Sequence, residues 1–183
     1  MALLPTFHPG LMNAWWLVLP LVLPMAYLGV TNKVAARRLA DMTGYGRRER
    51  FWTVVASLAP YPLMIATIWT PLTTLKPFLA GGALLYAVGV IIYLAALRAF
   101  ATTQAASLCM GGPYRMSRNP IYVGATLMFL GIGLMTMNLF LLVWLALSLL
   151  PQHLMILAEE RLCHERFGAA YERYRAEVPR YFR

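Results

Sequence analysis

The sequence has few charged residues and almost no cysteine. Only 13% of its 183 residues are Asp, Glu, Lys or Arg, and two are Cys. Soluble domains carry about 25% charged residues, so this composition argues against a soluble protein. Hydrophobic residues make up 60% of the chain, and the mean hydropathy is +0.61. At this length, a single compact bundle in a membrane is expected.

Several familiar catalytic patterns are absent as well. The sequence contains no Cys/His set with metal-ligand spacing, no Ser-His-Asp order and no GxGxxG fingerprint. We therefore expect no bound metal. Charged residues are missing from the long apolar runs, which argues against a proton-coupled transporter or an ion channel. Residues 1–10 carry no basic segment of the kind that begins a cleavable signal peptide.

Five apolar runs approach the length of about 20 residues that a bilayer core requires. They are 11–30, 51–70, 79–97, 121–137 and 139–157. The fourth run is short and lies directly before the fifth, so these two are expected to form a tight helical hairpin that turns near Asn138. The sequence thus predicts an all-α integral membrane protein with five transmembrane helices.

The distribution of charge predicts the orientation of these helices. All Lys and Arg residues except Lys76 lie in segments 31–50, 98–120 and 158–183, and every acidic residue lies in the first or third of these. Basic segments remain on the cytoplasmic side, which places the N-terminus outside and the C-terminus inside. The net charge of +9 then fits contact with anionic lipid headgroups better than with nucleic acid.

The segment 111–124 contains the most residues that specify a backbone conformation. Asn119 suits the N-cap position of a helix and Pro120 suits its first turn. The free N–H groups of a helix start, beside the guanidinium of Arg118, favour a carboxylate or phosphate ligand. The alternative is an ordinary capped entry into a membrane helix, with Arg118 extending to lipid headgroups.

Two adjacent carboxylates, Glu159 and Glu160, stand at the inner end of the last apolar run. Seven residues along a helix return to nearly the same face, so Gln152 aligns with Glu159 and His153 with Glu160. Carboxylates at a membrane boundary are costly unless they are hydrated or paired. They are therefore predicted either to bind hydroxyl or cationic groups of a ligand, or to pair with nearby arginines.

The tail 167–180 predicts a helix stop at Gly168 followed by a short amphipathic helix. Tyr171 and Tyr174 share one face of this helix and arginines cover the other. It would lie in the membrane interface or act as a lid over a cofactor pocket.

The third run carries one face of glycines and tyrosines at helical spacing, made of Gly82, Tyr86, Gly89 and Tyr93. Such a face favours close helix packing in which the tyrosine hydroxyls find hydrogen-bond partners. The alternative is that it lines a groove for a lipid substrate.

Taken in order, these motifs resemble the isoprenylcysteine carboxyl methyltransferase family and the related integral-membrane phospholipid methyltransferases. The resemblance covers residues 98–183. The matching residues are Gly112, Pro113, Tyr114, Arg118, Pro120, Ile121, Tyr122, Val123, Gly124, Glu159, Glu160, Phe167, Gly168, Tyr171, Tyr174, Val178 and Pro179. Asn119 stands where the family usually has His, so a titrating base at that position is absent.

The resemblance implies that the last two spans and the tail enclose S-adenosylmethionine, while a lipophilic substrate enters from the bilayer. It implies that Arg118 and Glu160 are catalytic. It also implies cofactor contacts from Gly112, Pro113, Tyr114, Arg118, Asn119, Pro120, Tyr122, Glu159 and Glu160. Arg118 would suit the cofactor's carboxylate, and either glutamate would suit its ribose or ammonium.

We therefore expect a methyltransferase that uses S-adenosylmethionine to methylate a lipophilic acceptor (an isoprenylcysteine-like carboxylate, a thiol or a phospholipid amine) at the cytoplasmic face of a prokaryotic plasma membrane. Residues 1–183 would form one domain, with a scaffold and substrate groove in 1–97 and the cofactor site in 98–183. The alternatives are an NADPH-dependent reductase of sterol-reductase type and a non-enzymatic scaffold. No pattern in the sequence bears on oligomeric state.

Overall fold

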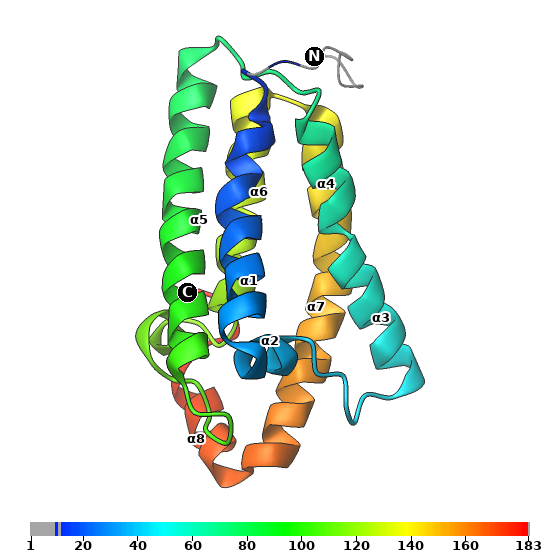
Figure 1. Cartoon of the computed structure of the whole chain (residues 1–183), viewed down its shortest axis with the longest axis vertical. Helices are drawn as coiled ribbons and strands as arrows, with labels where there is room; N and C mark the ends of the chain where they lie inside the picture. Colours follow the sequence, from blue (N-terminus) through cyan, green and yellow to red (C-terminus); the bar gives the residue numbers. More distant parts are fainter. Residues whose placement is uncertain (1–9, 11, 183) are drawn as a thin grey trace.

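The computed structural model describes residue 10 and residues 12–182, and helices make up 76% of the chain. No strand occurs among these described residues. Residues 1–9, Leu11 at the start of the expected first span, and Arg183 of the tail lie outside them. The long helices run side by side along the longest axis of the molecule (Figure 1). The all-α prediction is confirmed for the described part.

The elements follow one another in a simple order along the chain. They are η1 (Ala14–Val18), α1 (Leu19–Thr31), α2 (Lys33–Leu39), α3 (Arg47–Leu58), α4 (Pro60–Thr67), α5 (Lys76–Thr102), η2 (Gly112–Arg115), α6 (Pro120–Thr136), α7 (Leu139–Phe167) and α8 (Ala169–Glu177). Three described stretches are long and apolar enough to cross a membrane: Ala14–Thr31, α5 and α7. The helix α6 is apolar but shorter.

The expected second span, 51–70, is not one helix. It is divided into α3 and α4 at Ala59. Pro60 and Pro62 lack the backbone N–H groups that a continuous helix requires, so the helix breaks where they begin. The indole of Trp144 on α7 donates a hydrogen bond of 2.8 Å to the carbonyl of Ala59 and satisfies the backbone at this break.

The hairpin predicted near Asn138 is confirmed. Met137 ends α6 in a left-handed conformation with φ 48°, and Asn138 caps α7 by accepting a hydrogen bond of 2.9 Å from the N–H of Phe140. The Asn138 side chain also donates to the Thr70 hydroxyl at 3.2 Å. The turn therefore joins α6 and α7 and also ties them to the end of the α4 segment.

Glycines bring α5 and α6 into backbone contact. A Cβ atom added at Gly82 would lie 2.7 Å from the carbonyl oxygen of Gly131. Tyr86 and Tyr93 donate their hydroxyls to carbonyls of the N-terminal helical segment at 2.8 and 3.0 Å. The packing interpretation of this face is therefore confirmed, and Tyr93 also borders a cavity described below.

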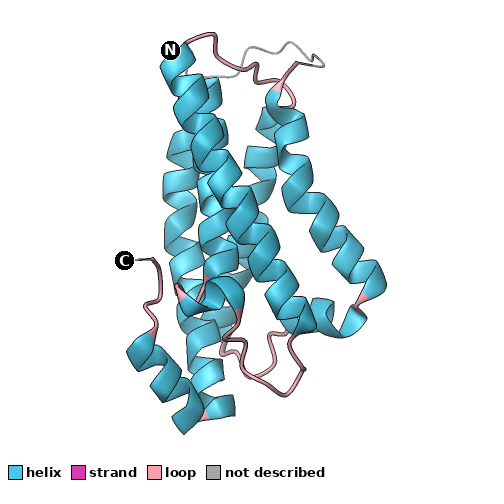
Figure 2. Cartoon of the chain, turned by 90° about the vertical axis from the view of Figure 1, so that its left-hand side faces the viewer, coloured by secondary structure: helices cyan, strands magenta, loops and turns pink. Residues whose placement is uncertain are grey.

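The three basic segments gather at one end of the bundle, which we call the polar end. The helices α2 and α8 and the start of α3 lie there, and α5 begins at the opposite end (Figures 1 and 2). Ion pairs cross between these segments: Arg161 lies 2.6 Å from Glu49, and Arg166 lies 3.7 Å from Asp41. As predicted, Gly168 ends α7, with a φ of 49°.

Candidate active site

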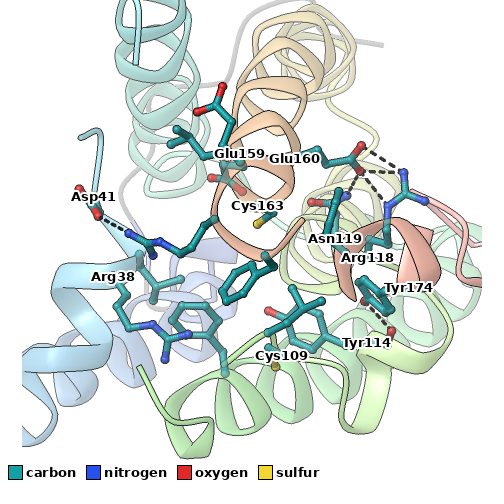
Figure 3. A pocket seen from close by; sticks show the side chains of 18 of the residues that line it. Arg38, Asp41, Cys109, Tyr114, Arg118, Asn119, Glu159, Glu160, Cys163 and Tyr174 are labelled. Carbon is teal, nitrogen blue, oxygen red and sulfur yellow. Dashed lines mark hydrogen bonds and ion pairs between the residues drawn. The ribbon is translucent and has the colours of Figure 1, made fainter. Parts of the chain in front are cut away.

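A cavity of about 480 Å³ opens at the polar end between α2, the loop before α6, the end of α7 and α8 (Figure 3). This volume lies within the range of about 300–1,000 Å³ that is usual for small-molecule sites. Its charged and polar lining includes Arg38, Tyr114, Arg118, Glu159, Arg166 and Tyr171. We call it the polar cavity.

Arg118 and Glu160 form a buried clamp at one side of this cavity. The Nη2 atom of Arg118 lies 3.0 Å from Oε1 of Glu160, and the two side chains are only 8% and 11% exposed. The Nη1 atom donates to the carbonyls of Val178 and Arg175 at 2.6 and 3.3 Å. Because Nε also donates to Oε1 of Glu160, all three nitrogens of the guanidinium are engaged within the protein.

Asn119 occupies the N-cap position of α6, but its side chain does not cap the helix. The predicted N-cap position is therefore confirmed, although the side chain makes no capping hydrogen bond. The side-chain amide instead donates hydrogen bonds to Oε1 of Glu160, at 3.1 Å, and to the carbonyl of Arg180, at 3.3 Å. The Nδ2 group is the donor in both bonds, and a hydrogen bond to an ionised carboxylate is stronger than one to a neutral acceptor. Pro120 stands in the first turn, as predicted.

The C-terminal segment is joined to the loop before α6. The N–H of Arg118 donates to the carbonyl of Pro179 at 2.9 Å, and the hydroxyl of Ser117 donates to the carbonyl of Arg180 at 2.9 Å. The guanidinium of Arg180 completes the contact, with Nη2 2.9 Å from Oε2 of Glu160. The clamp therefore holds α8 and the segment after it against the site.

Glu159 differs from its neighbour. The hydroxyl of Tyr122 donates to its Oε1 atom, and no ion pair to Glu159 occurs within residues 12–182. Carboxylates removed from bulk water are normally paired with a cation. The two glutamates therefore differ: Glu160 is paired with arginines, whereas Glu159 lines the cavity without an arginine partner among the described residues.

Two lining arginines were not singled out by the sequence analysis. Arg38 donates to the carbonyl of Thr103 at 2.9 Å, and its guanidinium lies 4.6 Å from the centre of the Phe100 ring. Arg166 pairs at 3.7 Å with the partly exposed Asp41. Both lie in basic segments that we expected to contact anionic lipid headgroups. Nothing in the composition of these segments distinguishes the two arginines from the basic residues around them.

Tyrosines form the wall on the side of α8. Tyr174 donates to the carbonyl of Tyr114 at 2.7 Å (Figure 3). Tyr171 is only 3% exposed, and its hydroxyl has no hydrogen-bond partner among the described residues. Burial raises the pKa of Tyr114 and of Tyr171 above the usual range, so both phenols stay protonated near neutral pH.

Three of the residues predicted to contact the cofactor, Gly112, Pro113 and Pro120, instead shape the backbone around the site. Gly112, with a φ of 57°, and Pro113 shape the short helix η2 that positions Tyr114, and Pro120 begins α6. These three do not line the polar cavity, whereas the other predicted residues do: Tyr114, Arg118, Asn119, Tyr122, Glu159 and Glu160.

A second cavity of about 580 Å³ adjoins the first, and we call it the apolar cavity. It lies between α1, α3, α4, α6 and α7, and most of its lining is hydrophobic. Exposed side chains of Val22, Met25 and Tyr61 border it, so it opens on the side of the bundle. Tyr122 and Glu159 line both cavities and stand at their junction.

Residues 77–170, just over half of the chain, match the family model described as Phospholipid methyltransferase. The chain belongs to the phospholipid methyltransferase family. Isoprenylcysteine carboxyl methyltransferases share this family, so the resemblance drawn from the sequence is confirmed. No curated protein and no solved structure matches the chain.

The region shared with the phospholipid methyltransferase family contains most of α5, all of α6 and α7, and the start of α8. It therefore includes Arg118, Tyr122, Glu159 and Glu160. Membership in this family implies methyltransferase activity at a membrane on lipid-like substrates.

Proposed function

We propose that the protein is a methyltransferase that binds S-adenosylmethionine in the polar cavity and a lipophilic acceptor in the apolar cavity. The observation that carries this proposal is the position of Glu159. Its carboxylate has no cationic partner among the described residues and stands where the two cavities meet. A cofactor with a cationic sulfur supplies the missing positive charge.

The residues of the polar cavity fit the parts of this cofactor. S-adenosylmethionine carries a carboxylate, an ammonium group, a ribose diol and a sulfonium. Arg38 and Arg166 offer guanidinium groups to the carboxylate, and Glu159 suits the sulfonium or the ammonium. The ring of Tyr114 suits the adenine or the sulfonium.

When bound, S-adenosylmethionine supplies a methyl group: a lone pair of the acceptor forms the new bond to carbon, and the electron pair of the broken carbon–sulfur bond stays on sulfur. The protein contributes alignment, because Glu159 and Tyr122 fix the boundary at which the two ligands meet. Arg118, Asn119 and Glu160 hold α8 over the site. Their predicted catalytic and binding roles thus become positioning roles in this proposal.

We also propose that the bundle crosses a prokaryotic plasma membrane five times, with the polar end in the cytoplasm. In this arrangement α3 and α4 together form the second crossing and α6 forms the fourth. The gathering of the basic segments at one end supports this orientation. Because Arg38 lies in the N-terminal part and lines the polar cavity, the scaffold 1–97 and the cofactor part 98–183 would share the site within one domain.

Calorimetry on the detergent-purified protein tests the cofactor. We expect micromolar binding of S-adenosylmethionine and weaker binding of S-adenosylhomocysteine, which lacks the sulfonium charge. Glu159→Gln should remove this preference, whereas Glu177→Gln, an exposed position on α8, should preserve it. No binding of either compound would refute the proposal. In that case NADPH binding, measured in parallel, would separate a reductase from a scaffold.

A further inference from the structure

One face of α7 carries polar side chains along the apolar cavity. Ser148, Gln152 and Glu159 all line this cavity and follow one another at helical spacing. Gln152 lies within the apolar run 139–157, where a polar side chain is costly in a membrane. It precedes Glu159 by seven residues, which is about 10 Å or roughly two turns of helix. A second polar position therefore stands well inside the cavity, away from the carboxylate at the junction.

The side chain of Gln152 makes one hydrogen bond among the described residues, from Nε2 to Oγ1 of Thr126 on α6 at 3.3 Å. An amide offers two N–H donors and an acceptor oxygen, and a hydroxyl can donate as well as accept. The amide oxygen of Gln152 and the hydroxyl proton of Thr126 are thus left without partners in the described part of the chain. If the amide is turned over, its two N–H donors are left instead. Both residues line the cavity and are partly exposed, so a ligand can reach them.

Two other hydroxyls in the lining of the cavity are bonded to their own helices. Ser57 donates to the carbonyl of Thr53 at 2.8 Å, and Ser148 donates to the carbonyl of Leu145 at 2.7 Å. Such local bonds use the hydroxyl proton and need no further partner. The bond between Gln152 and Thr126 differs, because it joins two helices and leaves both donor and acceptor capacity at the cavity wall.

A tie between α6 and α7 is the simplest role for this pair, since amide side chains join helices in membranes through hydrogen bonds. A tie uses only one of the available hydrogen-bonding functions, however, and the turn at Asn138 already joins these two helices. The remaining functions are complementary to an uncharged group that both donates and accepts, which is a hydroxyl or an amide.

We infer that Gln152 and Thr126 form a second polar contact for the ligand of the apolar cavity. This ligand is a lipophilic molecule that carries an uncharged hydroxyl or amide about 10 Å from the end that lies beside Glu159. A plain hydrocarbon at this depth would leave the amide of Gln152 unpaired, so the contact selects among lipophilic molecules and fixes how far each one enters. That the ligand is the methyl acceptor rests on the proposed function, and the pair takes no part in the chemical step.

The contact can be measured without the cofactor, using three compounds that compete for a fluorescent fatty alcohol in neutral detergent. They are hexadecanol, a hexadecanediol with its second hydroxyl on the neighbouring carbon, and a hexadecanediol with its second hydroxyl about 10 Å along the extended chain. We expect the last compound to bind about two- to tenfold more tightly than the other two, which corresponds to the contribution of about 0.5–1.5 kcal/mol from one uncharged hydrogen bond.

Variants assign this preference to the pair. Gln152→Leu should abolish it and Thr126→Val should weaken it, whereas Gln104→Leu, at an exposed loop position that lines neither cavity, should retain it. Circular dichroism and thermal unfolding show whether each variant is folded. If Gln152→Leu does not fold, Thr126→Val provides the same test.

Equal binding of the three compounds by the wild type would overturn the inference and leave the pair as a tie between α6 and α7. A preference that survives in folded Gln152→Leu would overturn it as well. The outcome is separable from that of the proposed function. A preference for the distant hydroxyl without binding of S-adenosylmethionine would support this contact and refute the methyltransferase proposal, and cofactor binding without the preference would do the reverse.

Discussion

Arg118 and Glu160 lie 42 residues apart in the sequence and form a bidentate ion pair, with Nη2 of the arginine 3.0 and 3.1 Å from the two carboxylate oxygens. Arg180 approaches the same carboxylate at 2.9 Å from the C-terminal segment. The loop before α6, the inner end of α7 and the end of the chain thus meet at one side chain. Its sequence neighbour, Glu159, takes no part in this cluster and contacts Tyr122 instead.

The two adjacent glutamates should respond differently to substitution. Glu160→Ala leaves the guanidinium of Arg118, which is 8% exposed, without its counter-charge, and breaking such a buried pair costs about 3–5 kcal/mol. Glu159→Gln removes a charge that has no cationic partner in the described structure, so stability should be unchanged or slightly higher. Thermal unfolding in detergent measures both. Equal destabilisation by the two substitutions would contradict this division of roles.

Local chemistry made several elements predictable from the sequence. The turn at Asn138 and the end of α7 at Gly168 follow from residues that adopt or cap those conformations on their own. The break between α3 and α4 follows from Pro60 and Pro62, although a hydropathy run of this length suggests one helix. In each case the deciding interaction lies within a few residues of the feature.

Features of the site that depend on contacts between distant parts of the chain could not be predicted from the sequence. Adjacent helical positions point about 100° apart, so Glu159 and Glu160 were certain to face different surroundings. Which of them meets the arginines depends on where residues 178–180 lie, and local sequence does not specify that. Asn119 bonds to the clamp rather than to its own helix for the same reason, and Arg38 reaches the polar cavity only because α2 folds under the bundle.

A pair of adjacent glycines tests the contact between α5 and α6. A Cβ atom at Gly82 would lie 2.7 Å from the Gly131 carbonyl oxygen, whereas one at Gly81 meets nothing within 4 Å. Gly82→Ala must push the helices apart, and overpacking of this kind costs about 1–3 kcal/mol. Gly81→Ala should leave the unfolding temperature unchanged or slightly raised. If both variants unfold at the wild-type temperature, the two helices do not pack as described.

Thiol labelling reports on occupancy of the polar cavity. Cys163 is partly exposed and lines this cavity, and Cys109 also lines it but is only 7% exposed. A maleimide should therefore react with Cys163 first, and bound S-adenosylmethionine should slow the reaction severalfold by covering the thiol. Mass spectrometry of Cys109→Ser and Cys163→Ser assigns the label. A labelling rate of Cys163 that saturating cofactor leaves unchanged would place the cofactor elsewhere.

The loop before α3 is held to α7 by Arg161, whose Nε and Nη2 atoms lie 2.7 and 2.6 Å from the carboxylate oxygens of Glu49. Nη2 also donates to the carbonyl of Gly44 at 2.9 Å. Tyr45, next to Gly44, lines both cavities. Arg161→Ala should therefore release the loop that carries Tyr45 and weaken the binding of ligands, while the free energy of unfolding changes little. The two side chains are partly exposed, at 38% and 28%, and ion pairs open to solvent contribute little to folding.

The ion pair between Arg161 and Glu49 should make the stability of the folded protein depend on pH. The hydrogen bond from Arg161 is the main influence that lowers the pKa of Glu49 below its usual value in the folded protein. A lowered folded-state pKa gives stability that is fully present above the pKa of the unfolded chain and is lost as pH falls through the folded-state value. Unfolding temperatures measured from neutral pH down to about pH 3 should therefore fall less steeply for Glu49→Gln than for the wild type, while Glu177→Gln should follow the wild type. Parallel curves for Glu49→Gln and the wild type would show that this ion pair does not hold the loop.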